Sequence, residues 1–442
     1  MSEKTLIRGG TVLTLGARTP NLVGADVLIE GGIVAEVGSG IRVRGADVVE
    51  ADNAIVMPGF VDTHRHAWKS LFRNIGEGGS GASSALDSSV YWPHYQPDDV
   101  YAATLIGLLG AIEAGITTVV DWSDISSDSA HVDAALEAHR DAGLRTVFVH
   151  STPAWGGGRE DEKVELRRLA ARRAKTSEDP TVVAFGPRDP SVSDLDRVAR
   201  EWGLARELGM RVHTHVGADP ADRGVVSRLG HGGLLGEDVT LIHCSHLDDS
   251  DLDAIASSKA AVSLTPSSEM ANGMGLPPVQ KLIDRGIRPG LGIDSERVAP
   301  GDIFAQMRAT NSTQHATHFD LKLAGKGGLS SVLTTREVIR FATIDGARVA
   351  GLGAVTGSIE KGKQADIIVL RTDRPNIWPI NDPIGAVVWG MDTSNVDCVF
   401  AGGRALMERG EMTADVERAR SLAMEAQRRV AEAAGLVAGV GS

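Results

Sequence analysis

Two histidines stand at the end of an apolar run near the start of the chain. The run Ile55–Val61 is followed by Asp-Thr-His-Arg-His, which separates His64 from His66 by a single residue. In a β-strand, residues two apart face the same side, so we expect both imidazoles to point the same way. Such a pair is a weak signal alone, because two histidines at this spacing also occur in proteins where they bind no common metal ion.

More potential ligands follow later β-branched runs. His213 and His215 lie at the end of one run, His243 at the end of the next, and Asp294 at the end of another. Imidazole and carboxylate groups around an open coordination position are what a catalytic Zn²⁺ or similar divalent ion requires. Such an ion lowers the pKa of bound water toward about 7 and so supplies a nucleophile. The pattern therefore predicts a catalytic metal site.

Eight such runs alternate with helical patterns, for example leucines at i, i+3 and i+4 from Leu105 onward. The runs are Ile55–Val61, Ile116–Asp121, Arg145–His150, Thr181–Phe185, Arg211–Val216, Val239–His243, Ala261–Leu264 and Gly290–Asp294. Eightfold strand–helix alternation predicts an α/β fold, a (β/α)₈ TIM barrel over residues 57–355. The ligand candidates then share its catalytic face. A doubly wound open sheet is the second choice, because no Gly-x-Gly-x-x-Gly follows the first strand.

The two ends of the chain resemble each other. Asp26–Glu30 and Asp397–Ala401 are short β-rich runs, and each is followed by Gly-Gly and a second such run. This arrangement is typical of hairpins. We expect residues 1–56 and 356–442 to form one small β-sandwich domain, with a C-terminal helix. Two independent β caps are the alternative.

Composition excludes several classes of protein. Apolar residues make up 42% of the 442 residues and charged residues 23%, which is typical of globular proteins. The net charge is −13 without a basic cluster, so we expect no nucleic-acid or anionic-membrane partner. Two cysteines cannot form a disulfide framework. We see neither a signal peptide nor an apolar span, and we expect a cytoplasmic protein. A homo-oligomer remains open.

Four motifs resemble the amidohydrolase superfamily, in its branch of cytosine deaminase-like and triazine hydrolase-like enzymes. The motifs are Met57–His66, Glu113–Thr118, Gly357–Asp366 and Val399–Arg404. The resemblance covers nearly the whole chain. It is specific for the family and not for a substrate.

The resemblance implies a ligand set of His64, His66, His215 and Asp294. It also implies that Asp294 takes a proton from the bound water and that His243 orients the water or the substrate. Binuclear members of the superfamily bridge two metals through a lysine near the fourth strand, and the run Thr181–Phe185 has no lysine. We therefore expect one divalent ion per chain, with Zn²⁺ favoured and Fe²⁺ or Mn²⁺ as alternatives.

Two positions depart from the family pattern. Deaminases of this branch carry Glu three residues after the fifth-strand ligand, where this chain has Ala218, with Asp219 next. Glu269 stands where the branch usually has Asn. We expect Glu269 to supply the missing acid, unless it is a solvated loop charge. Glu296 is a weaker candidate.

Residues 67–97 belong to the longest gap between strands, the one between the first and the second, and are rich in Gly, Ser and aromatic residues. A long loop at this face of a barrel shapes the active site. We expect Trp68, Arg73, Trp92 and Trp155 to contact the substrate, the rings by stacking and the guanidinium through an anionic or carbonyl group. A core aromatic and a salt bridge are the alternatives.

Together these observations predict a mononuclear metal-dependent hydrolase whose metal-bound hydroxide attacks an sp² carbon of a small cyclic nitrogen-containing substrate. Deaminase-like C–N hydrolysis is the first choice. Because Ala218 replaces the usual Glu, displacement of another leaving group, as in a chlorohydrolase, is the alternative. A non-catalytic binding protein that retains the fold is the second alternative.

Overall fold

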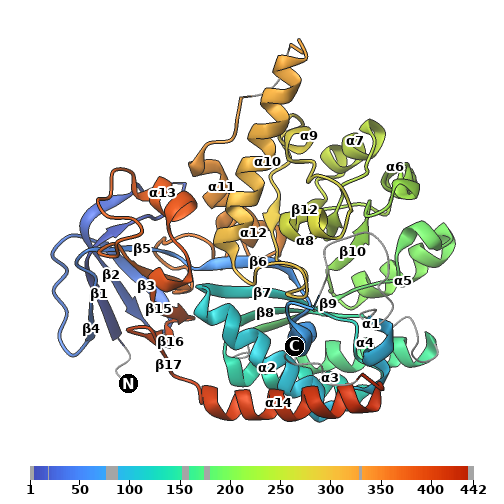
Figure 1. Ribbon diagram of the computed structural model, residues 1–442, viewed down its shortest axis with the longest axis horizontal. Helices are drawn as coiled ribbons and strands as arrows, with labels where there is room; N and C mark the ends of the chain where they lie inside the picture. The colour runs from blue at the N-terminus through green and yellow to red at the C-terminus, as the bar shows by residue number, and fades with distance from the viewer. Residues whose placement is uncertain are drawn as a thin grey trace.

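The computed structural model describes residues 4–17, 19–75, 88–151, 159–173, 180–327 and 331–436. Figure 1 shows two parts, a strand–helix barrel and a β-sheet beside it in which blue strands from the start of the chain lie beside orange-red strands from near its end. The predicted fold class, a TIM barrel with a β unit built from both termini, is confirmed.

Eight parallel strands of the described chain form the barrel, in sequence order. They are β6 (Phe60–Arg65), β7 (Ile116–Ser123), β8 (Arg145–His150), β9 (Thr181–Phe185), β10 (Val212–Val216), β11 (Val239–His243), β12 (Ala261–Leu264) and β13 (Gly290–Leu291). The first and last strands meet, because Ile293 N donates to His64 O at 3.0 Å and His66 N donates to Asp294 O at 2.9 Å. This closure excludes the open doubly wound sheet.

Helices cover the outside of the barrel in Figure 1. They are α2 (Pro97–Glu113), α3 (Ser129–Ala142), α4 (Arg159–Arg173), α5 (Leu195–Glu207), α6 (Val225–His231), α7 (Asp249–Ser258), α8 (Pro266–Ala271), α9 (Val279–Ile283), α10 (Ile303–Leu323), α11 (Thr335–Phe341) and α12 (Ile344–Val349). Sequence signals determine their ends. The Asp128 carboxylate caps the start of α3, and Gly143 ends it in the left-handed region at φ 81°.

The termini form one nine-stranded mixed sheet. Its strands are β1 (Lys4–Val12), β2 (Leu22–Glu30), β3 (Ile33–Gly38), β4 (Asp47–Glu50), β5 (Ala54–Pro58), β14 (Ile367–Arg371), β15 (Val396–Ala401), β16 (Arg404–Glu408) and β17 (Glu411–Met412). β5 pairs antiparallel with β14, which joins the N-terminal strands to the C-terminal ones. The alternative of two independent caps is therefore wrong. Buried side chains such as Val56 and Val369 form a core separate from that of the barrel.

The prediction of one strand over Ile55–Val61 is wrong. The run contains the end of β5, which belongs to the terminal sheet, and the start of β6, the first barrel strand. The chain changes sheets at Gly59, where an added Cβ would lie 2.1 Å from Cγ2 of Thr117. Both sides of the break are buried, so hydrophobicity could not reveal it.

The remaining elements are short, apart from the C-terminal helix. They are η1 (Ala67–Phe72), α1 (Ser88–Tyr91), η3 (Trp92–His94), η4 (Pro190–Val192), η5 (Pro220–Asp222), α13 (Pro383–Gly385), η6 (Ala386–Gly390), η7 (Thr393–Asn395) and α14 (Val416–Ala433). The helix α14 lies along α2 of the barrel, and Gln427 donates to the carbonyl of Leu71 in η1 at 2.9 Å. None of the helices in the described ranges is both long and apolar enough to cross a membrane.

Candidate metal centre and active site

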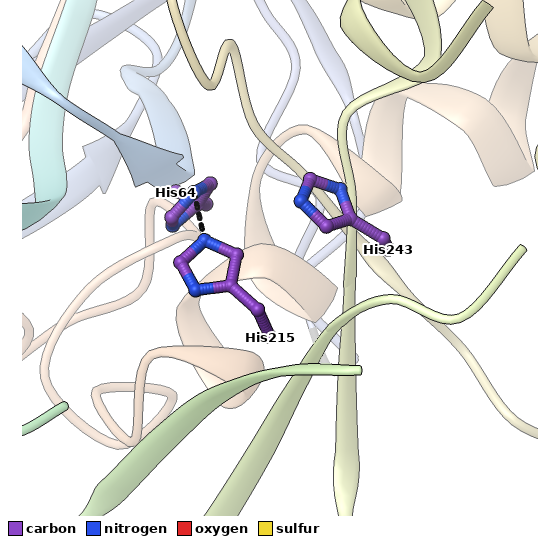
Figure 2. A group of neighbouring side chains, drawn as sticks. All are labelled: His64, His215 and His243. Carbon is purple, nitrogen blue, oxygen red and sulfur yellow. Dashed lines mark hydrogen bonds between the residues drawn. The ribbon is translucent and has the colours of Figure 1, made fainter. Parts of the chain in front are cut away.

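Four histidines and one aspartate meet at the carboxyl ends of the barrel strands. His64 Nε2 lies 3.2 Å from His215 Nε2 and 3.7 Å from Asp294 Oδ1, and His66 Nε2 lies 3.5 Å from the same oxygen. Figure 2 shows His243 directed toward His64 and His215 from the neighbouring strand. The structure therefore brings together all the residues predicted as metal ligands.

This donor set fits a divalent cation. The described chain has two groups of three potential ligands, and within each group the ligand atoms lie within 4.8 Å of one another. One group is His64, His215 and His243, and the other is His64, His66 and Asp294. Burial, together with the neighbouring imidazoles, holds the pKa of His64 and His215 well below its usual range. Neutral imidazoles are the ligand form of histidine. A cation would also bind the ring nitrogens that face each other across the pair His64–His215.

Asp294 is the anionic member of the cluster. Burial raises the pKa of its carboxyl group, but the charges of His66, His243 and Lys69 outweigh that effect and lower it to about 2. Ser268 Oγ donates a hydrogen bond to Asp294 Oδ2 at 2.5 Å, and Asn272 Nδ2 donates to Ser268 Oγ at 3.0 Å. Ser268 was not predicted. Its only signal is its place between the seventh strand and Glu269.

Backbone strain occurs at the same strand ends. His243, Cys244 and Asp294 have φ values of 76°, 61° and 64°, in the left-handed region that non-glycine residues seldom adopt. Such conformations are unfavourable and persist where the surrounding structure holds them, commonly at active sites. Here they occur at the ends of β11 and β13, where the chain leaves the barrel and the side chains of His243 and Asp294 enter the cluster.

His66 is oriented by an aspartate that was not predicted from the sequence. Asp124 Oδ1 lies 3.1 Å from His66 Nδ1 and accepts a hydrogen bond from Trp68 Nε1 at 2.8 Å. Burial raises the pKa of Asp124, but the His66 imidazole and other partners hold it well below its usual range. An anionic Asp124 holds the Nδ1 proton and directs Nε2 of His66 toward Asp294. Its position after β7, at the catalytic face, was the available signal.

Glu269 lies behind His243. Its side chain is fully buried, and its Oε1 accepts a hydrogen bond from Thr265 N at 2.7 Å and lies 3.4 Å from His243 Nδ1. No described residue donates a hydrogen bond to its Oε2. The alternative of a solvated loop charge is therefore wrong, because the first turn of α8 turns this carboxylate toward β11.

The other acids near the site have different partners. Asp219 is exposed and accepts a hydrogen bond from Ala221 N at 2.8 Å, so it caps the turn η5 and does not take the place of the residue missing at Ala218. Glu296 accepts hydrogen bonds from Ser70 Oγ at 2.6 Å and from Arg73 Nε at 2.8 Å. Among these candidates, only Glu269 contacts a histidine of the cluster.

The predicted substrate contacts have structural partners. Trp68 is buried, and its ring packs edge-on against Trp92 with centroids 4.9 Å apart. Arg73 pairs with Glu296. These are the contacts of a core aromatic and of a salt bridge, the two alternatives that the sequence left open. Substrate binding by Trp68, Arg73 and Trp92 stays a prediction. Trp155 lies outside the described residues.

Comparisons with known proteins agree with this geometry. The family model described as "Amidohydrolase family" matches residues 55–406. A 5'-deoxyadenosine deaminase from Methanothermobacter thermautotrophicus is 30% identical over 93% of this chain and 95% of its own length. A 5-methylthioadenosine/S-adenosylhomocysteine deaminase from Desulforamulus reducens is 26% identical over 98% of this chain and 100% of its own length.

Solved structures share the fold. An adenosine deaminase from Xanthomonas campestris with bound zinc has a TM-score of 0.85 and 21% identity, covering 97% of this chain and 98% of its own. An atrazine chlorohydrolase from Arthrobacter aurescens with zinc has a TM-score of 0.84 and 22% identity, covering 96% of this chain and 100% of its own. The predicted resemblance to the amidohydrolase superfamily is confirmed by the family model and by the deaminase relatives.

Proposed function

Because this chain belongs to the amidohydrolase family and is a hydrolase that acts on C–N bonds, we propose that it deaminates a small amino-substituted nitrogen heterocycle. Its curated relatives are named as deaminases of adenosine derivatives, which makes nucleosides of that kind the first substrates to test. The observation that carries the proposal is the convergence of His64, His215 and Asp294 at one face of the barrel. The buried Glu269 carboxylate supports it by contacting Nδ1 of His243.

We assign the metal to His64, His66, His215 and Asp294, one ion per chain. Zinc is favoured because it takes imidazole and carboxylate ligands with an open position, and iron(II) or manganese(II) fits the same set. When bound, the ion would lower the pKa of water to about 7 and so make a nucleophile available at neutral pH. A single ion is supported by the fourth barrel strand β9, which has no lysine to bridge two.

Asp294 transfers the proton, and His243 and Glu269 orient the reacting groups. The Asp294 carboxylate accepts one proton from the attacking water and delivers it to the departing nitrogen. A C–O bond forms, the C–N bond breaks, and the amino group leaves as ammonia. His243 orients the water and stabilises the developing negative charge, while Glu269 holds the Nδ1 side of the His243 ring.

A second candidate reaction is displacement of a better leaving group, such as halide, from an electron-poor ring. The observation that favours it is Ala218, which leaves the position of the usual proton donor without an acid. A halide leaves without protonation, so that reaction would need only Asp294 and His243. General acid–base help contributes about 10²–10⁴-fold, so the leaving group decides how much the missing Glu matters.

A matched pair of substrates separates the two reactions. Ammonia release is measured from adenosine, 5'-deoxyadenosine and 5'-methylthioadenosine, and chloride release from 6-chloropurine riboside, with zinc-loaded protein. We expect ammonia from at least one amino nucleoside. Chloride release without ammonia from any of them would replace deamination by the second candidate. Absence of both products from protein that holds its metal would favour the binding-protein alternative.

A further inference from the structure

Lys69 lies beside the ligand cluster, three residues after His66 in η1. Its ammonium nitrogen is 5.0 Å from the centre of the Trp92 ring and 5.6 Å from that of Trp68. The two indoles pack edge-on against each other, and Trp68 is tied to Asp124 by its ring N–H. The ammonium therefore lies against two indole rings, one of which is hydrogen-bonded to Asp124, the residue that orients His66.

This ammonium has no anionic partner among the described residues. The other cations of the same segment are paired: Arg65 Nε lies 2.7 Å from Asp62, and Arg73 Nε lies 2.8 Å from Glu296. The ammonium of Lys69 has neither an ion pair nor a hydrogen bond within the described chain, although an ammonium offers three donors and the residue is half-buried. A partly desolvated ammonium whose N–H donors are unused within the described chain is favoured when another group accepts from it.

The positive charge of Lys69 lowers the pKa of two carboxyl groups at the site, those of Asp124 and Asp294. Burial raises the pKa of Asp124, and the charges of His66 and Lys69 lower it below its usual range. Lys69 acts in the same direction on Asp294. A short chain of contacts places the ammonium beside the site: Lys69 lies against the Trp68 ring, Trp68 donates to Asp124, and Asp124 contacts His66.

We propose that Lys69 binds a negatively charged group near the reacting carbon, so that the enzyme prefers, among amino-substituted nitrogen heterocycles, those that also carry an acidic group. The inference deepens the proposed function and rests on it. The indoles of Trp68 and Trp92 hold the ammonium, and the substrate's anion supplies the countercharge. Lys69 is then a substrate-binding residue that determines specificity.

Two probes of the same shape test the charge directly, purine-6-carboxylate and the neutral purine-6-carboxamide. Their affinities are measured by titration calorimetry for the metal-loaded wild type, Lys69→Met and Lys69→Arg. Lys69→Met should weaken binding of the carboxylate by about tenfold or more, because hydrogen bonds to charged groups are among the stronger ones. Binding of the carboxamide should change less than about threefold, and Lys69→Arg should retain most of the carboxylate affinity.

Other outcomes overturn the inference. These are an equal loss for both probes, an unchanged carboxylate affinity in Lys69→Met, or no carboxylate binding by the wild type. Metal content and thermal unfolding of Lys69→Met should match the wild type, which separates substrate binding from a structural role against the indoles. The calorimetric result does not depend on turnover. A selective loss in Lys69→Met would therefore stand even if no ammonia were released from any heterocycle.

Discussion

The Oε1 atom of Glu269 lies 3.4 Å from Nδ1 of His243, and both side chains are buried. This contact gives the site a third carboxylate besides Asp294 and Asp124, at the Nδ1 side of His243. Glu269 reaches the reaction only through that imidazole, so it is a positioning residue and not a ligand.

Replacement of Glu269 tests this arrangement. We expect Glu269→Ala to lower kcat by about 10–100-fold with metal content unchanged, since loss of a residue that orients a site histidine has effects of this size. Glu269→Gln should lose less, because its amide oxygen can still accept the Thr265 N–H. The matched control is Asp219→Ala, which removes an exposed turn cap and should leave kcat as it is. A kcat within about threefold of wild type in Glu269→Ala would contradict the assignment.

Asp294 is expected to be indispensable. Asp294→Ala removes both a proposed ligand and the proposed proton acceptor, so turnover should fall by at least the 10²–10⁴-fold that general acid–base help contributes. Steady-state ammonia release measures this, with circular dichroism to show that the variant is folded. Turnover like that of the wild type would exclude the mechanism.

Asp124 is expected to tune metal affinity through His66. Asp124→Asn removes the negative charge that holds the Nδ1 proton, and affinity for zinc should fall by about 10–100-fold in competition with a chromophoric chelator. Asp128→Asn is the matched control, because Asp128 Oδ1 lies 2.7 Å from Nδ1 of His131, a similar pair at the start of α3. Equal affinities in the two variants would show that Asp124 does not act on the site.

Removal of the metal should lower thermal stability. Ligand binding stabilises the folded state by about 4 kcal/mol when the free ligand is at 1,000 times its Kd. Elemental analysis of the purified protein should find about one ion per chain, as expected for a mononuclear site. Chelation should lower Tm, and zinc should restore it. The double variant His64→Ala/His66→Ala should contain no metal and show no response to chelator. About two ions per chain would require a bridging ligand that has not been identified.

Much of the barrel could be predicted because its signals are local. Six later strands, from β7 to β12, were found within two residues of their observed ends, since β-branched runs between helical patterns mark them whatever they pair with. The ligand cluster followed from the same reasoning. Parallel strands in a barrel end at one face, so His64, His215 and Asp294 had to converge although they are far apart in sequence.

The boundary between the two domains was expected between residues 56 and 57, but the position of the change of sheet, at Gly59, could not be predicted in this way. A buried strand of either sheet is apolar on both faces, so the run Ile55–Val61 carries no periodicity that separates β5 from β6. The break follows from the approach of Thr117 to Gly59, a contact between residues 58 positions apart.

The sequence by itself determined the barrel, the β unit from both termini and the types of group at the strand ends, because hydrophobic period and residue chemistry are properties of short segments. Only the tertiary structure decided which groups touch. It placed Asp124 on His66, Glu269 on His243, and the ammonium of Lys69 against the indole of Trp92. Each of these contacts joins two different segments of the chain, and packing and barrel closure set their separation.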